Sequence, residues 1–288
     1  MKSVAYLAAP MLAAAVLGAA LAPGNAHAAQ AAASAAQYTP SVGQEGKDVI
    51  WVPTPQALVE RMLTIADVKP TDYVMDLGSG DGRTVITAAK KFGARALGIE
   101  YNPDMVELSK RNAEQQGVAD RAQFRHADIF ATDFSEATVI TMYLLPSLNL
   151  KLRPTLLKLK PGTRLVSHAF TMDDWQPDQT EYVEGRTAYL WIVPARVEGR
   201  WRIDLTGANP AHYDVELRQR FQNLEGEARA GNGVLQIRDG KVRGEEVTFT
   251  VSDGKSAGRA FTGHLSGDRL EGTSRGGSAA PWTGTRIK

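Results

Sequence analysis

The chain has 288 residues, of which 43% are hydrophobic and 23% charged, the composition of a globular protein with room for a large domain and a smaller one. Its 33 lysine and arginine residues nearly balance 32 acidic residues, giving a net charge of +1. This balance lacks the basic excess of nucleic-acid-binding proteins, so we expect no nucleic-acid partner. Cysteine is absent, which excludes disulfides, thiolate metal sites and cysteine nucleophiles, and we expect no metal.

The first 28 residues have the organisation of a secretory signal peptide. Lys2 precedes an apolar run over residues 5–22, and Ala26-His27-Ala28 has the small-x-small pattern of a cleavage site. We therefore expect cleavage near residue 28 and export, to the periplasm. The alternative is an uncleaved anchor that keeps the chain close to a membrane, because the apolar run is just long enough to span a bilayer. Residues 29–48 are predicted to be a disordered lead-in.

Residues 49–195 alternate strand and helix patterns, which is typical of an α/β domain with a mainly parallel, Rossmann-like sheet. Helices are predicted after Pro55, through residues 85–89 as far as Gly93, and from Pro103, which follows the N-cap residue Asn102. The predicted strands are residues 73–77, 96–100, 122–127, 138–143 and 164–170, with a closing antiparallel pair at 180–183 and 187–193.

Residues 196–288 are predicted to form an all-β module, a small barrel or sandwich. Short alternating segments are separated by turn signals such as Asp-Gly, and no helical periodicity remains. The candidate strands are residues 201–205, 213–221, 234–237, 247–251, 260–265 and 283–287.

The first predicted strand runs into a glycine-rich turn, residues 76–83 (DLGSGDGR). A nucleotide cofactor approaches the backbone closely at such a turn, and glycine has no Cβ to obstruct it. Dinucleotide-binding folds use G-x-G-x-x-G to receive a pyrophosphate, whereas Gly78, Gly80 and Gly82 form G-x-G-x-G behind Asp76. A carboxylate here would repel a phosphate but suits the amino group of a methionine moiety. The turn therefore predicts S-adenosylmethionine rather than NAD.

Two further acidic residues follow the next two predicted strands. Glu100 ends the second strand, 22 residues after Gly78, where its carboxylate can accept hydrogen bonds from both ribose hydroxyls. Asp128 follows the third strand and is placed to accept from the adenine amino group, or alternatively to cap its own turn. The glycines and the acids together predict a cofactor site, with a merely structural version of the same fold as the alternative.

Several motifs resemble the ATP synthase c-subunit lysine methyltransferase family and its bacterial relatives, over roughly residues 50–193. They are WVPTP (51–55), DLGSGDGR (76–83), YLLP (143–146), LNLKLRP (148–154) and VSH (166–168). The resemblance implies a seven-strand methyltransferase fold and an S-adenosylmethionine-dependent N-methyltransferase activity, often on lysine.

Four residues near the ends of the strands are candidates for the acceptor side of the site. Tyr143 is predicted to orient an amine, or to pack on the sheet edge. Asn149 is predicted to hold an amine through its carbonyl, or to cap a helix. His168 is predicted to accept a proton near neutral pH, or to be a satisfied core histidine. Thr54, between two prolines, is predicted to cover the cofactor or to cap the following helix.

We expect an S-adenosylmethionine-dependent N-methyltransferase that acts on a protein lysine. Methyl transfer requires a neutral amine, and deprotonating a lysine at pH 7 costs roughly 4–5 kcal/mol unless a pocket lowers its pKa. One alternative is an exported binding protein that uses the fold without turnover. Another is a methyltransferase for a small-molecule or lipid amine, with the β module as receptor. The sequence carries no indication of an oligomeric state.

Overall fold

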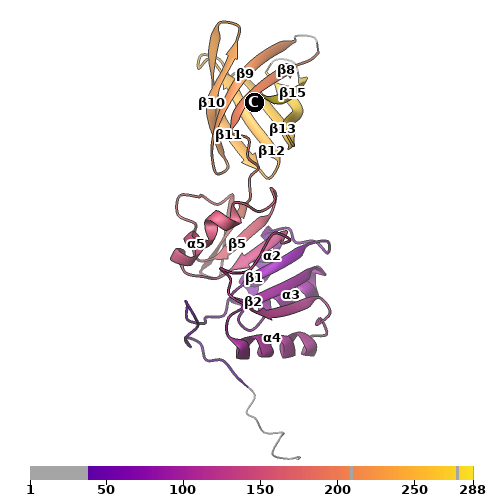
Figure 1. Ribbon diagram of the computed structural model, residues 1–288, viewed down its shortest axis with the longest axis vertical. Helices are drawn as coiled ribbons and strands as arrows, with labels where there is room; N and C mark the ends of the chain where they lie inside the picture. The colour runs from indigo at the N-terminus through magenta and orange to yellow at the C-terminus, as the bar shows by residue number, and fades with distance from the viewer. Residues whose placement is uncertain (1–37, 208–209, 277–278, 288) are drawn as a thin grey trace, which may run out of the picture. The chain divides into compact units, whose positions relative to one another are not determined.

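A computed structural model describes residues 38–207, 210–276 and 279–287 (Figure 1). The expected signal peptide, residues 1–28, and the first part of the lead-in lie outside these residues. Within the part that is described, no helix has both the length and the apolar character needed to cross a membrane.

A seven-stranded sheet with the order β3-β2-β1-β4-β5-β7-β6 forms the first half of the described chain (Figure 1). The first five strands run parallel, whereas β7 is antiparallel to both β5 and β6. The predicted fold class, with its closing antiparallel pair, is confirmed. The strands are β1 (Tyr73–Leu77), β2 (Arg95–Glu100), β3 (Ala122–His126), β4 (Val139–Met142), β5 (Arg164–His168), β6 (Gln179–Val183) and β7 (Arg186–Ile192).

Helices cover both faces of this sheet because successive strand residues point to opposite sides. On one face, α2 (Gln56–Ile65), α3 (Arg83–Phe92) and α4 (Pro103–Gln115) pack their apolar sides against strand residues such as Val74. On the other face, α5 (Pro146–Leu156) packs against strand residues that include Met75 and Leu77. The sheet is therefore buried on both faces, and its polar chemistry is confined to the strand ends.

The predicted helix boundaries on either side of β2 are present in the structure. Gly93 ends α3 in the left-handed conformation, with φ of 70°. The Asn102 side chain accepts hydrogen bonds from the backbone N–H groups of Asp104 and Met105, so it caps α4 as expected. These caps fix the register of the two helices that flank the ends of β1 and β2.

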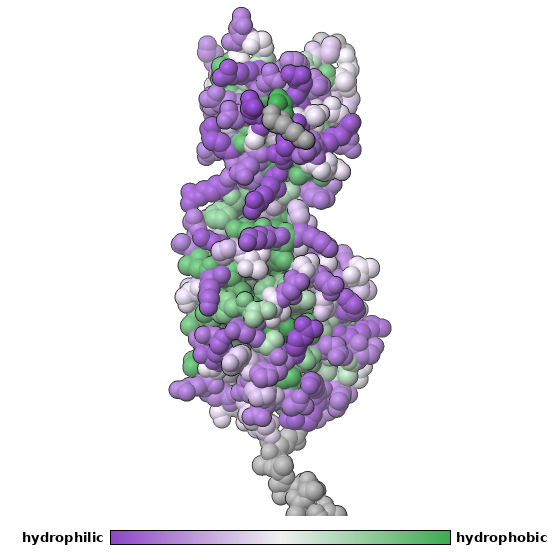
Figure 2. All heavy atoms as spheres, viewed as in Figure 1, coloured by the Kyte–Doolittle hydropathy of each residue, from purple (hydrophilic) through white to green (hydrophobic). Residues whose placement is uncertain are grey.

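The second half of the chain is a closed antiparallel barrel rather than a sandwich, with the order β10-β11-β12-β13-β14-β15-β8-β9. Its interior is filled by side chains that include Trp201, Phe249, Phe261 and Trp282, and its visible outer face is mostly hydrophilic (Figure 2). The strands are β8 (Gly199–Leu205), β9 (Ala211–Arg220), β10 (Asn223–Ala230), β11 (Gly233–Arg243), β12 (Glu246–Ser252), β13 (Arg259–Ser266), β14 (Arg269–Arg275) and β15 (Ala280–Ile287).

Two strands of the barrel, β10 and β14, are absent from the strands predicted above. Their sequences, NLEGEARA and RLEGTSR, contain few β-branched or aromatic residues, so local propensity does not mark them as strands. They form because strands on both sides pair with them in the closed barrel.

The end of the lead-in differs from the expectation of disorder. Residues 43–51 form a small hairpin in which Gly43 N–H donates to Trp51 O and Trp51 N–H donates to Gln44 O, both at 2.9 Å. An isolated bridge joins Glu45 and Ile50 inside it. The polar composition of residues 29–48 could not show that their last residues pair with the segment that follows.

Trp191 in β7 provides a test of the packing beneath the sheet. Its side chain is fully buried and its indole N–H donates to the backbone oxygen of Trp175 at 2.8 Å. We predict that Trp191→Ala lowers the free energy of unfolding by about 3–5 kcal/mol, and Trp191→Phe by less, because phenylalanine fills more of the cavity. Urea unfolding followed by the circular dichroism of the helices measures this. An unchanged urea midpoint of unfolding for Trp191→Ala would contradict a stabilising role of the Trp191 side chain.

Candidate active site

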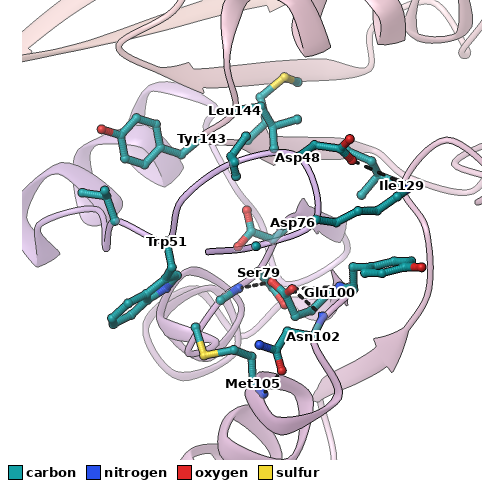
Figure 3. Close-up of a pocket in the computed structure, with 18 of the residues that line it drawn as sticks. Asp48, Trp51, Asp76, Ser79, Glu100, Asn102, Met105, Ile129, Tyr143 and Leu144 are labelled. Carbon is teal, nitrogen blue, oxygen red and sulfur yellow. Dashed lines mark hydrogen bonds and ion pairs between the residues drawn. The ribbon is translucent and has the colours of Figure 1, made fainter. Parts of the chain in front are cut away.

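A cavity of about 640 Å³ lies at the carboxyl ends of the parallel strands. Its walls come from the hairpin at residues 43–51 with the segment up to Thr54, from the glycine turn after β1, and from the residues that follow β2, β3 and β4. Figure 3 shows Asp76 between Tyr143 and Leu144 on one side and Asn102 and Met105 on the other. Its size suits a small-molecule cofactor, and its position is where open α/β sheets bind their ligands.

The glycine turn has a backbone that only glycine adopts easily. Gly80 and Gly82 have φ of 54° and 82°. A Cβ on Gly80 would lie 2.6 Å from the Trp51 indole nitrogen, and one on Gly82 would lie 2.7 Å from the Phe124 ring. The turn is thus packed on both sides. Gly78 and Gly80 line the cavity, whereas Gly82, also predicted to bind the cofactor, is not among the lining residues and packs against Phe124.

Asp76 presents a buried carboxylate at the end of β1. Only 7% of the residue is exposed, and its Oδ1 accepts a 2.6 Å hydrogen bond from the Thr141 hydroxyl. It makes no ion pair with any residue that the structure describes. Burial raises the pKa of Asp76 to about 7, and the charges of Glu100 and Asp81 act in the same direction. The ionised form therefore lacks a cationic partner.

Glu100 is held by backbone donors. Its Oε2 accepts from Gly80 N–H at 2.9 Å, and its Oε1 accepts from Tyr101 N–H at 2.8 Å and from Asn102 N–H at 2.9 Å. A carboxylate has about four acceptor positions, so Oε2 keeps room for one further donor. This geometry accommodates one ribose hydroxyl, whereas the prediction of two requires a backbone donor to move.

Asp128 lines the same cavity and is fixed from two directions. Its Oδ1 accepts from Phe130 N–H at 2.8 Å, which is the local turn contact expected as the alternative, and its Oδ2 accepts from the Lys47 ammonium at 2.6 Å. The hydrogen bond from Lys47 is the largest of the effects that hold the pKa of Asp128 below its usual range. Asp128 therefore stays ionised and keeps acceptor capacity toward the cavity.

Tyr143, His168 and Thr54 form one group. The Tyr143 ring lines the cavity and lies over the His168 ring, with centroids 3.8 Å apart. His168 Nδ1 and the Thr54 hydroxyl are 3.1 Å apart, and Thr54 lines the cavity without capping α2. Burial, together with the charge of Arg186, lowers the pKa of His168 to about 4. His168 is thus neutral near pH 7 and only a weak proton acceptor, and its ring supports Tyr143 from behind.

Asn149 is placed differently from both predictions. It lies within α5, whose N-cap is Leu145, so it does not cap the helix. Its amide nitrogen donates to Ser167 Oγ and to the backbone oxygens of Phe170 and Thr171, each at 3.3 Å. It is fully buried and is not among the residues that line the cavity, and its Oδ1, the atom predicted to hold an amine, has no hydrogen-bond partner among the described residues. Its contacts instead tie α5 to the segment after β5.

Neither the hairpin nor the apolar residues opposite it were predicted to belong to the site. Trp51 appears in a family-like motif, but nothing in the sequence marks Lys47. The apolar wall is also lined by Leu144, Leu145 and Leu148, which lie in the family-like motifs at 143–146 and 148–154, and by Ile129 and Phe170, which nothing in the sequence marks.

A solved structure resembles this half of the chain. It is described as an RNA methyltransferase from Salinibacter ruber in complex with S-adenosyl-L-homocysteine, and it is 55% identical in sequence with a TM-score of 0.50. The similarity covers 51% of this chain and 96% of that chain. S-Adenosyl-L-homocysteine is the demethylated product of S-adenosylmethionine, so the neighbour supports the predicted cofactor.

The charges of the cavity fit S-adenosylmethionine, which carries a sulfonium and an ammonium group. Six carboxylates line the described cavity against two cations, so a positive ligand is favoured and a pyrophosphate is disfavoured. All three predicted acids line this cavity, and their assignment, Asp76 to the amino acid part of the cofactor, Glu100 to the ribose and Asp128 to the adenine, stays a prediction. The unpaired, buried carboxylate of Asp76 is the part of the site that most requires a cation.

We predict that the affinity for S-adenosylmethionine falls as Asp76 becomes protonated. The ligand ammonium binds the ionised carboxylate, so affinity should rise with pH from about 5 to 7, approaching roughly tenfold per unit at the lower end, and then level off. Asp76→Asn should bind about 10- to 100-fold more weakly and lose this pH dependence, because a charge-assisted hydrogen bond is removed.

Isothermal titration calorimetry at several pH values measures both effects. Asp133→Asn is the matched control, since Asp133 is exposed and bonded to Ser135 away from the cavity. Equal affinity of Asp76→Asn and the wild type at every pH would refute the role of Asp76.

Curated relatives identify the family. Residues 76–179 match the ANTKMT methyltransferase domain. The protein-lysine N-methyltransferase of Saccharolobus islandicus (strain REY15A) is 46% identical over 151 residues, which is 50% of this chain and 94% of that protein. The human ATP synthase c-subunit lysine N-methyltransferase is 37% identical over 106 residues, 36% of this chain and 45% of its own length. The chain thus spans less than half of the human relative. It belongs to the family of S-adenosylmethionine-dependent methyltransferases represented by the Saccharolobus islandicus protein.

Proposed function

We propose that this methyltransferase transfers the methyl group to the side-chain amine of a lysine in a protein. The names of its archaeal and human relatives support this acceptor. The observation that carries the proposal is the contrast between the two ends of the cavity. Carboxylates surround the cofactor end, whereas the other end is lined by Tyr143, Leu145, Leu148 and Phe170. Apolar walls accept the four methylene groups of a lysine side chain.

The apolar walls at this end of the cavity also favour the neutral, reactive form of the amine. Removing an ammonium group from water favours its neutral form and lowers its pKa, which reduces the cost of deprotonation. The described residues of the acceptor end offer no strong base, since a pKa of about 4 makes His168 a weak proton acceptor and its ring stands behind Tyr143. The proton therefore leaves to solvent before the amine enters, and the neutral amine is the nucleophile.

Positioning provides the remaining catalysis. The bound cofactor supplies a methyl group activated by its sulfonium, and the protein must align the amine nitrogen with that methyl carbon. Tyr143 is held for this task by His168 on one side and lies parallel to the Phe170 ring, with centroids 6.1 Å apart. An aromatic face attracts the developing positive charge on the amine nitrogen. Thr54 fixes His168 and so helps to hold the ring in place.

We predict that the ring of Tyr143 matters more than its hydroxyl. Tyr143→Ala should lower kcat about 100-fold, because an acceptor displaced by about 1 Å loses that much rate. Tyr143→Phe should retain most of the activity, and both variants should bind S-adenosyl-L-homocysteine like the wild type. Tyr182→Ala is the matched control, since Tyr182 is 72% exposed on β6. Full activity of Tyr143→Ala would remove Tyr143 from the site.

The acceptor class can be determined directly. Purified enzyme is incubated with methyl-labelled S-adenosylmethionine and cell-envelope extract, and the label is followed into protein, lipid, small-molecule and RNA fractions. We expect label in protein, recovered as methyl-lysine after hydrolysis, and much less label with Asp76→Asn at a cofactor concentration below the dissociation constant of that variant. Label confined to lipid, small amines or RNA, the acceptor class named for the Salinibacter ruber neighbour, would refute the lysine proposal.

We also propose that the protein works outside the cytoplasm, in the periplasm or held at a membrane by its N-terminus. The basis is the sequence of residues 1–28, with its apolar run and its small-x-small site. A fusion of the first 35 residues to a reporter that is active only after export tests this. Reporter activity with cleavage supports a signal peptide, export without cleavage supports an anchor, and no activity contradicts both.

A further inference from the structure

The hairpin at residues 43–51 has a fixed base and an exposed tip. At the base, backbone hydrogen bonds join Trp51 to Gly43 and Gln44, and the Trp51 indole lies against Gly80 of the glycine turn. At the tip, Gly46 N–H donates to Val49 O at 3.0 Å, and residues 46–48 are exposed. The tip can therefore move while the base stays packed on the cofactor turn.

Lys47 is the tip residue that contacts the cavity-lining residues after β2 and β3. Its ammonium lies 2.6 Å from Asp128 Oδ2, 3.8 Å from Asp48 Oδ2 and 4.8 Å from the centre of the Tyr101 ring. The other cation of the described cavity lining, Arg83, is paired with Asp81. Lys47 is thus the one lining cation that reaches the adenosine end.

We propose that Lys47 is a cofactor-positioning residue that clasps the hairpin over the adenosine end of the site, and that cofactor exchange requires the Lys47–Asp128 pair to separate. Asp128 is the carboxylate assigned to adenine. Its Oδ1 accepts from Phe130 N–H and its Oδ2 accepts from Lys47, so about two of its four acceptor positions are left, enough for the adenine amino group. Lys47 therefore orients Asp128 without displacing the ligand.

The Lys47–Asp128 ion pair is weak enough to break and re-form each time the cofactor exchanges. Both side chains are about one-third exposed, and exposed ion pairs contribute little and are screened by salt. Such a contact slows the release of a ligand beneath it by a modest factor and does not trap the product. The proposal rests on the cofactor site and not on the identity of the acceptor.

The test is the dissociation rate of S-adenosyl-L-homocysteine from the full-length enzyme, measured by stopped-flow tryptophan fluorescence. We expect Lys47→Gln to release it about 1.5- to fivefold faster, the range set by one exposed ion pair. Lys47→Arg should restore the slow rate. Added salt should accelerate release from the wild type and have little effect on Lys47→Gln, a response that a merely structural role would not produce.

Lys110→Gln is the matched control, because Lys110 forms a similarly exposed pair with Glu107 on α4 outside the cavity. Equal release rates for Lys47→Gln, Lys110→Gln and the wild type would overturn the clasp. That result would leave cofactor binding intact, whereas a wild-type protein that binds no S-adenosyl-L-homocysteine would overturn the cofactor site itself, and the clasp with it.

Discussion

The rest of the site depends on the buried carboxylate of Asp76, which forms no ion pair with any described residue. The hydrophobic strand β1 carries it into the interior, and Thr141 of β4 fixes its orientation. Burial raises its pKa to about 7, so near neutral pH it is poised between two charge states and gains most from a cationic ligand. The glycine turn that follows gives such a ligand access to the backbone. Cofactor choice thus follows from the electrostatics of one strand end.

The fold places two different environments in one cavity. Parallel strands bring Asp76, Glu100 and Asp128 to the same edge of the sheet, because each lies at or just beyond the carboxyl end of its strand. The residues after β4 and β5 supply Tyr143 and Phe170, which are aromatic and apolar. A charged cofactor and an amine that must be neutral to react are therefore received by opposite ends of the cavity. All of the residues that line this cavity precede the barrel in the chain.

The predictable parts of the structure were those encoded by local rules. Apolar strands, the Asn102 cap and the Gly93 helix end follow from burial and backbone geometry within a few residues. The strands β10 and β14, the hairpin that carries Lys47 and the internal position of Asn149 depend on partners distant in sequence. His168 shows that sequence alone does not reveal burial: its residue type suggests proton transfer near neutral pH, but burial lowers its pKa to about 4 and makes it a weak base. The sequence therefore marked the carboxylates of the cavity and Tyr143, whereas the hairpin with Lys47 and the surroundings of His168 and Asn149 required the structure.

The central role of Asp76 is tested most directly by the number of protons released when the cofactor binds. Calorimetric titration with S-adenosylmethionine at about pH 6, in two buffers of different ionisation enthalpy, measures it. A carboxylate with a pKa of about 7 is mostly protonated there and must ionise to pair with the ligand cation, so we predict release of close to one proton per cofactor. Asp76→Asn should release almost none. Binding by the wild type without proton release would contradict the central role of Asp76.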